Sequence, residues 1–166
     1  MSNARNKVIY LITTSLCLRD NRQHDFNDIP YVTEKELSSA EAVYIAGGEP
    51  VLFSDPDNIA SYLKNRYKNI RKVYLCANVT ETNMFLNRGG NLSHINGVDL
   101  SITQEYDQLL FSFVSRVIRD KFPEVKDNRI FVSDGLMPDD PIGFKVINQE
   151  RQENFRPADG SILRRI

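Results

Sequence analysis

A short polar turn, Gly47-Gly48-Glu49-Pro50, ends an apolar, β-prone run in the first third of the chain. Because the two glycines carry no side chain, a small polar molecule can approach the backbone closely there. The carboxylate of Glu49 is costly to bury without a partner, so we expect it to meet an ammonium group or a basic side chain. The turn therefore predicts a ligand site, and the alternative is an ordinary strand-to-helix turn that stops at a proline.

Polar residues also end the next two predicted strands, and they complete this predicted site. Asn78 ends one of these strands, and Ser101 and Thr103 lie at the end of the other. Ligands bind at the carboxyl ends of the strands in parallel α/β sheets, where such groups could fix a ribose or a carboxylate. Simple capping of the following helices explains the same residues equally well. The predicted ligand-binding residues are Gly47, Gly48, Glu49, Pro50, Asn78 and Ser101.

The polar segment 17–31 holds a second group of side chains that could do chemistry. His24, Asp25 and Asp28 offer nitrogen and oxygen ligands to a metal ion. Cys17 would be a nucleophile only if a base activated it, and His24 is the base that the sequence offers nearby. Because the segment lacks a recognised zinc or calcium spacing, we favour a solvated acidic loop. Cys17, His24 and Asp25 remain weak metal candidates.

The remaining cysteine and histidine have ordinary structural interpretations. Cys76 lies within an apolar run, so we expect a small core residue. His94 lies in a predicted loop or helix end, where a lone histidine is more often a hydrogen-bonding surface residue than a catalyst. Two cysteines do not make a disulfide framework.

Composition and charge exclude several classes of function. The chain has 166 residues and a formal net charge of −1, with 41% hydrophobic and 26% charged residues, as is ordinary for one globular domain. A net charge near zero gives no field that would recruit nucleic acid or an anionic membrane. No apolar stretch approaches the ~20 residues of a membrane helix. We expect a cytoplasmic protein whose partners are a small molecule and another protein, and neither nucleic acid nor membrane.

Apolar runs and amphipathic stretches alternate along the chain, which predicts a parallel sheet with right-handed crossovers. The chain is too short for a closed eight-stranded barrel of about 250 residues. We therefore predict an α/β fold, a partial (β/α)5-6 parallel barrel over residues 5–149, followed by a charged surface tail over 150–166. The predicted strands are 7–13, 42–46, 72–77, 98–102, 129–132 and 144–147, and the clearest helices are 55–67 and 104–121.

Four segments occur in an order and spacing that carry a family resemblance: Thr13–Arg19, Gly47–Pro50, Leu75–Asn78 and Gly97–Ile102. Together they resemble the radical S-adenosylmethionine (SAM) superfamily over roughly residues 7–134. The resemblance implies a partial parallel barrel in which the backbone of the glycine turn and Glu49 hold the amino group of the methionine moiety. It also implies that a polar residue at the end of the fourth strand helps to bind the carboxylate or ribose of SAM.

The resemblance fails at the iron–sulfur cluster. The family holds a [4Fe–4S] cluster with three thiolates spaced Cys-x-x-x-Cys-x-x-Cys, and here those positions are Cys17, Asn21 and His24. An Asn amide is a poor, neutral donor for iron, and Cys76 belongs to another predicted strand. We therefore expect no bound cluster and no reductive cleavage of SAM.

The sequence thus predicts a degenerate, cluster-less radical-SAM-like protein, a pseudoenzyme that acts by binding. Its pocket would take SAM, a nucleotide or another amino-bearing small molecule, and the protein would be a regulator or the partner of another protein. One open alternative is a non-radical, metal-assisted hydrolase or transferase that uses His24 with Asp25 or Asp28. Another is a radical SAM enzyme with an atypically ligated cluster.

Overall fold

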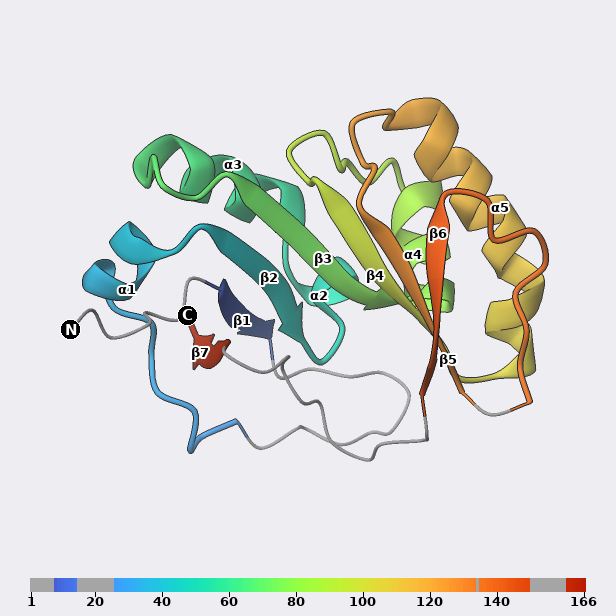
Figure 1. Ribbon diagram of the computed structural model, residues 1–166, viewed down its shortest axis with the longest axis horizontal. Helices are drawn as coiled ribbons and strands as arrows, with labels where there is room; N and C mark the ends of the chain where they lie inside the picture. Colours follow the sequence, from blue (N-terminus) through green and yellow to red (C-terminus); the bar gives the residue numbers. More distant parts are fainter. Residues whose placement is uncertain (1–7, 15–25, 134, 150–160) are drawn as a thin grey trace.

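The computed structural model describes residues 8–14, 26–133, 135–149 and 161–166, which form seven strands and five helices (Figure 1). The elements, in chain order, are β1 (Val8–Thr14), α1 (Glu34–Ser39), β2 (Ala42–Gly47), α2 (Pro50–Phe53), α3 (Pro56–Arg66), β3 (Lys72–Asn78), α4 (Val79–Asn87), β4 (Gly97–Ile102), α5 (Glu105–Lys121), β5 (Asn128–Ser133), β6 (Phe144–Gln149) and β7 (Ile162–Arg165).

All seven strands belong to one parallel sheet, with the order β6-β5-β4-β3-β2-β1-β7. From β1 to β6 each strand lies beside the next strand in the chain, so the chain crosses the sheet in one direction. The parallel sheet confirms the predicted α/β fold. The predicted five or six strands become seven, because the last strand, β7, pairs with the first.

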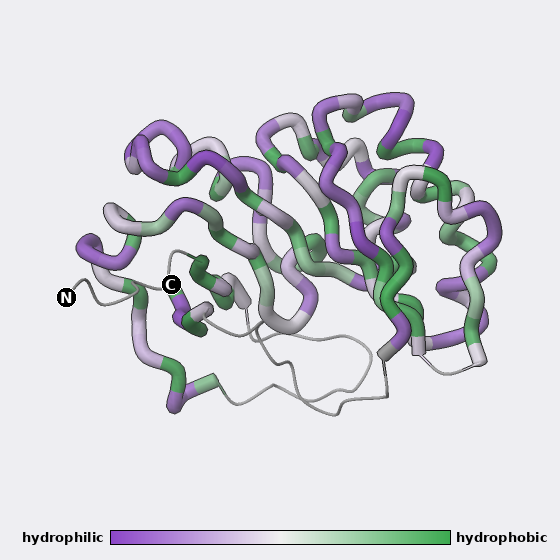
Figure 2. Tube along the Cα trace, in the orientation of Figure 1, coloured by the Kyte–Doolittle hydropathy of each residue, from purple (hydrophilic) through white to green (hydrophobic). Residues whose placement is uncertain are grey.

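The two faces of the sheet are packed differently, because side chains alternate along each strand. Val43 and Ile45 of β2 belong to the main core, which also contains Phe111 of α5 and residues of the other helices. The opposite face carries a smaller cluster built on Tyr10 and Ile12, to which no described helix contributes. The helices therefore pack on one face. Hydrophobic residues are concentrated along the strands, and hydrophilic residues along the outer loops (Figure 2).

Stacked tyrosines and an ion pair fill much of the face opposite the helices. The Tyr44 ring stacks between Tyr10 and Tyr74, with ring centroids 4.6 and 4.5 Å apart. Arg129 of β5 is paired with the buried Asp99 of β4, and its guanidinium lies 5.6 Å from the centre of the Tyr44 ring. The hydrogen bond to Asp99 raises the pKa of Arg129, and burial raises the pKa of Tyr44. The middle of this face is therefore occupied by the protein's own side chains.

Helix α5 is the longest described helix, with 17 residues. Its buried side includes Phe111, Val114 and Ile118, and the Phe111 ring meets the Phe144 ring of β6 edge-on, with centroids 5.1 Å apart. None of the helices in the described part of the chain is both long enough and apolar enough to cross a membrane.

Residues 161–166 are the described part of the predicted surface tail over 150–166, and they do not form a free tail. Strand β7 lies in the sheet, where it pairs with β1. Arg164 pairs with Glu36 at 2.8 Å, and the Arg165 guanidinium lies 4.2 Å from the centre of the Tyr31 ring. Over residues 161–166 the structure therefore differs from the prediction, because strand pairing and these two contacts order a short, charged sequence that has no long apolar run.

Candidate functional site

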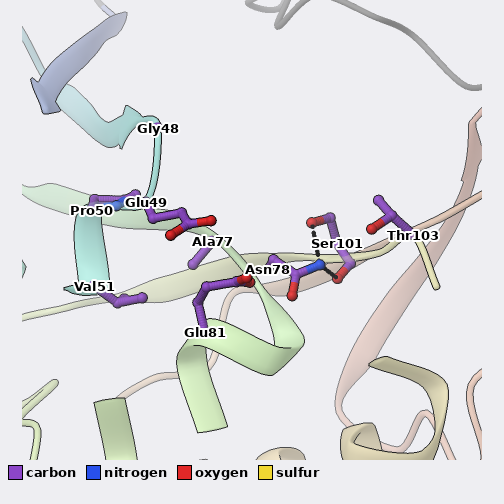
Figure 3. Close-up of a pocket in the computed structure, with 9 residues that line it drawn as sticks. All are labelled: Gly48, Glu49, Pro50, Val51, Ala77, Asn78, Glu81, Ser101 and Thr103. Carbon is purple, nitrogen blue, oxygen red and sulfur yellow. Dashed lines mark hydrogen bonds between the residues drawn. The ribbon is translucent and has the colours of Figure 1, made fainter. Parts of the chain in front are cut away.

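A pocket of about 180 Å³ lies at the C-terminal ends of β2, β3 and β4 (Figure 3). Five of the six predicted ligand-binding residues line it, and the sixth, Gly47, lies in the turn directly before them. The structure thus brings residues from three strand ends to one place. The lining consists of Gly48, Glu49, Pro50, Val51, Ala77, Asn78, Glu81, Ser101 and Thr103.

The glycine turn is held close to the end of β1. Gly47 has a φ of 135°, and a Cβ atom at this position would lie 2.4 Å from the carbonyl oxygen of Thr14. The amide of Gly48 donates to that same oxygen at 2.9 Å. Glu49 then precedes the short helix α2, and its carbonyl oxygen accepts two amide hydrogens of that helix at 3.1 and 3.2 Å. The backbone that presents the Glu49 side chain is therefore fixed on both sides.

A second carboxylate, that of Glu81, lines the same pocket. Glu81 is the third residue of α4 and is 4% exposed, and Glu49 is 6% exposed. Figure 3 shows the two carboxylates directed into one space beside Ala77. No motif in the sequence singles out Glu81. Its one signal is an acidic residue three positions after a strand-ending Asn, which is also the ordinary pattern of a helix start.

Asn78 fixes the wall of the pocket between β3 and β4. Its side-chain oxygen accepts the amide of Thr80 at 2.8 Å and so caps α4. Its side-chain nitrogen donates to the Ser101 carbonyl at 3.1 Å and to the Asp107 carboxylate at 3.0 Å. Asn78 therefore has the predicted capping role at the same time as it faces the pocket.

The carboxylate of Asp107 joins the starts of two helices behind this wall. It is fully buried and accepts the amides of Thr103, Gln104 and Thr80, at 2.9, 3.1 and 3.3 Å. The hydroxyls of Thr80 and Thr103 also donate to it. The sequence does not reveal this role of Asp107 either, because the Thr80 donors of α4 lie 27 residues away in the chain.

The polar side chains of the pocket are mainly hydrogen-bond acceptors. Among the described residues that line it are the carboxylates of Glu49 and Glu81 and the hydroxyls of Ser101 and Thr103, and none of these lining residues is basic. Carboxylates form their strongest hydrogen bonds with charged donors such as an ammonium group. The lining therefore suits the amino end of a ligand better than a phosphate or a carboxylate.

The side chains that could bind iron in this chain do not fit the [4Fe–4S] cluster of the family that the sequence resembles. Cys17, Asn21 and His24, as well as Asp25, lie outside the described residues. Cys76 lies on β3, where burial raises the pKa of its thiol. The described residues contain no group of three His, Cys, Asp or Glu side chains that could hold a metal ion. With two cysteines in the whole chain, the three thiolates of a [4Fe–4S] site are not available.

His94 is a half-exposed, hydrogen-bonded residue, in line with its predicted surface role. Its Nδ1 lies 2.9 Å from the carboxylate of the buried Asp57, which also accepts the His94 amide at 2.7 Å and the Asn91 side chain at 2.9 Å. This group precedes β4, whereas Ser101 lies near the end of that strand. The Asp57 carboxylate thus orders the loop before β4, away from the pocket.

Comparison of the chain with protein-family models, curated proteins and solved structures finds no match, so the pocket itself is what bears on function.

Proposed function

We propose that this chain is a cluster-less, radical-SAM-like binding protein that holds the amino end of a small molecule at the C-terminal ends of β2, β3 and β4. The observation that carries the proposal is the meeting of Glu49, Asn78 and Ser101, from three separate strand ends, around one pocket. The family resemblance associates Glu49 and the fourth-strand residue Ser101 with SAM, and the parallel order of β1 to β6 is compatible with a partial barrel.

Binding, rather than one-electron chemistry, is the activity that these residues support. Reductive cleavage of SAM needs an electron source that protein side chains do not supply, and the chain lacks the thiolates for the usual cluster. SAM, a nucleotide and other amino-bearing molecules are the candidate ligands, and a regulator or a partner of another protein is the candidate role. The acceptors around the pocket favour ligands that present an ammonium group.

Isothermal titration calorimetry with SAM, S-adenosylhomocysteine and adenosine tests the proposal. SAM and S-adenosylhomocysteine should bind, adenosine should not, and Glu49→Gln should weaken binding by about tenfold or more because a charged partner is lost. Glu124→Gln removes the charge of an exposed Glu outside the pocket and serves as the matched control. Equal binding by the Glu49→Gln protein and the wild type would contradict the assignment of this site.

Iron analysis after anaerobic reconstitution tests the cluster-less part of the proposal separately. We expect well under one iron per chain. About four irons per chain with the brown colour of a cluster would refute that part, because such a content requires a [4Fe–4S] centre.

A further inference from the structure

We infer that this chain forms a weak two-fold dimer in which helix α5 packs antiparallel against α5 of a second copy. Three exposed apolar side chains, Tyr106, Leu109 and Phe113, make the contact, and Glu105 and Arg116 border it. None of these residues lines the pocket, so the inference does not depend on the proposed function.

The first observation is a second apolar side on α5, which lies at one end of the helix layer (Figure 1). The buried side of this helix includes Phe111 and Val114. Tyr106, Leu109 and Phe113 follow one another at helical spacing, so they form a separate stripe that is turned away from the core. These three side chains are 57%, 71% and 42% exposed. A helix with apolar residues on its solvent side as well as its buried side favours burial against a further surface.

The second observation is charge complementarity, and it points to a second copy of the chain as the partner. Glu105 and Arg116 are both exposed, and they lie about three turns apart on the same side of α5, next to the stripe. When two copies of α5 run antiparallel, each Glu105 comes close to Arg116 of the other copy, so one two-fold arrangement forms two ion pairs. A parallel pair would bring Glu105 against Glu105 instead.

The ends of the helix favour the same orientation. The last turn of α5 carries Arg119 and Lys121, and the first turn begins with Glu105. Antiparallel packing places the basic end of each helix beside the acidic end of the other, in agreement with the two helix dipoles. The charges therefore select the antiparallel arrangement from the two that a two-fold axis allows.

The size of the stripe determines how strong the dimer can be. An aromatic side chain presents about 150–250 Å² of surface, so the three exposures leave on the order of 300 Å² of apolar area in water. A standard interface buries about 800 Å² per partner. The stripe supplies less than this, and we expect a dissociation constant of about 10–100 μM. The chain should accordingly be monomeric at low micromolar concentration.

Sedimentation velocity of the full chain, between about 1 and 500 μM, tests the inference. The wild type should change from monomer to dimer over this range. Leu109→Lys places a charge at the centre of the stripe and should raise the dissociation constant about tenfold or more. Met137→Lys is the matched control, because Met137 is an apolar residue outside α5 that is 64% exposed, and it should leave the dissociation constant unchanged.

A charge swap tests the antiparallel orientation. Glu105→Arg replaces two attractions with two repulsions and should weaken the dimer about fivefold or more. Adding Arg116→Glu to the same chain restores opposite charges with their positions exchanged, and should return the dissociation constant to within about twofold of the wild type. A merely structural role of either residue would not give this recovery. Circular dichroism checks that each variant keeps the fold.

Each outcome supports the inference or overturns it. A wild type that stays monomeric at about 500 μM would overturn it and would leave the stripe to a different partner. A dimer that Leu109→Lys does not weaken, or that Met137→Lys weakens equally, would place the contact elsewhere on the molecule. No recovery in the double variant would exclude the antiparallel pairing. The wild-type series and the charge swap decide the matter even if Leu109→Lys does not fold.

Discussion

At the scale of single residues, the pocket depends on buried carboxylates with different tasks. The Asp107 carboxylate organises two helix starts, and those of Glu49 and Glu81 face the space that a ligand would enter. The sequence points to Glu49 because it follows two glycines at a strand end. It does not distinguish the other two, because an acidic residue in the first turn of a helix is usually a cap. Glu81 and Asp107 become parts of a site because α4 packs beside α2 and α5 in the folded protein.

Removal of the Asp107 carboxylate should destabilise the fold. Asp107→Ala leaves several buried amide and hydroxyl donors without their acceptor, and we expect a loss of about 2–4 kcal/mol in the free energy of unfolding. Urea denaturation followed by circular dichroism measures it. Asp120→Ala, at an exposed position of α5, is the control and should change stability by less than about 0.5 kcal/mol. A loss below about 1 kcal/mol for Asp107→Ala would show that its hydrogen bonds matter little.

Substitution of Gly47 should be costly for a steric reason. Gly47→Ala places a Cβ atom 2.4 Å from a backbone oxygen at a φ of 135°, and we expect a loss of about 2–4 kcal/mol. Gly89→Ala is the matched control, since Gly89 also has a positive φ but has nothing within 4 Å of its Cβ position. That change should cost about 1 kcal/mol. Equal thermal stability of the two variants would contradict the close approach of the turn to β1.

At the scale of elements, apolar runs predict the first six strands correctly in kind and in order. Parallel strands are buried on both faces, so they appear in the sequence as continuous apolar stretches. Strand β7 lacks such an apolar stretch, because two of its four residues are Arg164 and Arg165, so the sequence does not predict it. Its pairing with β1 is a long-range interaction, which local propensity does not report. Helix α2 is not predicted for another reason. Pro50 suggests the end of a secondary-structure element, but proline also fits the first turn of a helix, and α2 begins at Pro50.

The contact between β7 and α1 should depend on pH. The hydrogen bond from Arg164 lowers the pKa of Glu36 below its ordinary value of 4.5. A lowered carboxyl pKa stabilises the folded state above the unfolded pKa, and this stabilisation is lost as the pH falls through the folded pKa. Arg164→Gln should therefore cost about 1 kcal/mol at pH 7, and the difference from the wild type should shrink below about pH 4.5.

Urea denaturation between pH 3 and pH 7 checks the dependence on pH. Arg116→Gln, on the exposed side of α5, provides the control because it removes the same charge away from β7. A difference between Arg164→Gln and the wild type that stays constant down to pH 3 would rule out Glu36 as the partner that matters.

At the scale of the whole molecule, the sheet determines where a ligand can enter. One face is covered by helices, and the middle of the other is occupied by the stacked tyrosines and the Arg129–Asp99 pair. The pocket remains at the C-terminal ends of the central strands, as expected for a parallel sheet. The sequence indicated this place because its turn and strand-end residues are local features. It did not indicate the second carboxylate, since that depends on how separate elements meet.

Nuclear magnetic resonance titration of the ¹⁵N-labelled protein with SAM and with S-adenosylhomocysteine tests the binding of an amino-bearing molecule at these strand ends most directly. The amide signals of Gly48, Glu49, Asn78 and Ser101 should shift in a saturable way, and Glu49→Gln should require about tenfold or more ligand for the same shifts. The amides near His94, at the other end of β4, should not move and report on nonspecific effects. Shifts confined to that region, or no saturable shift with either compound, would contradict the assignment of the pocket as a binding site.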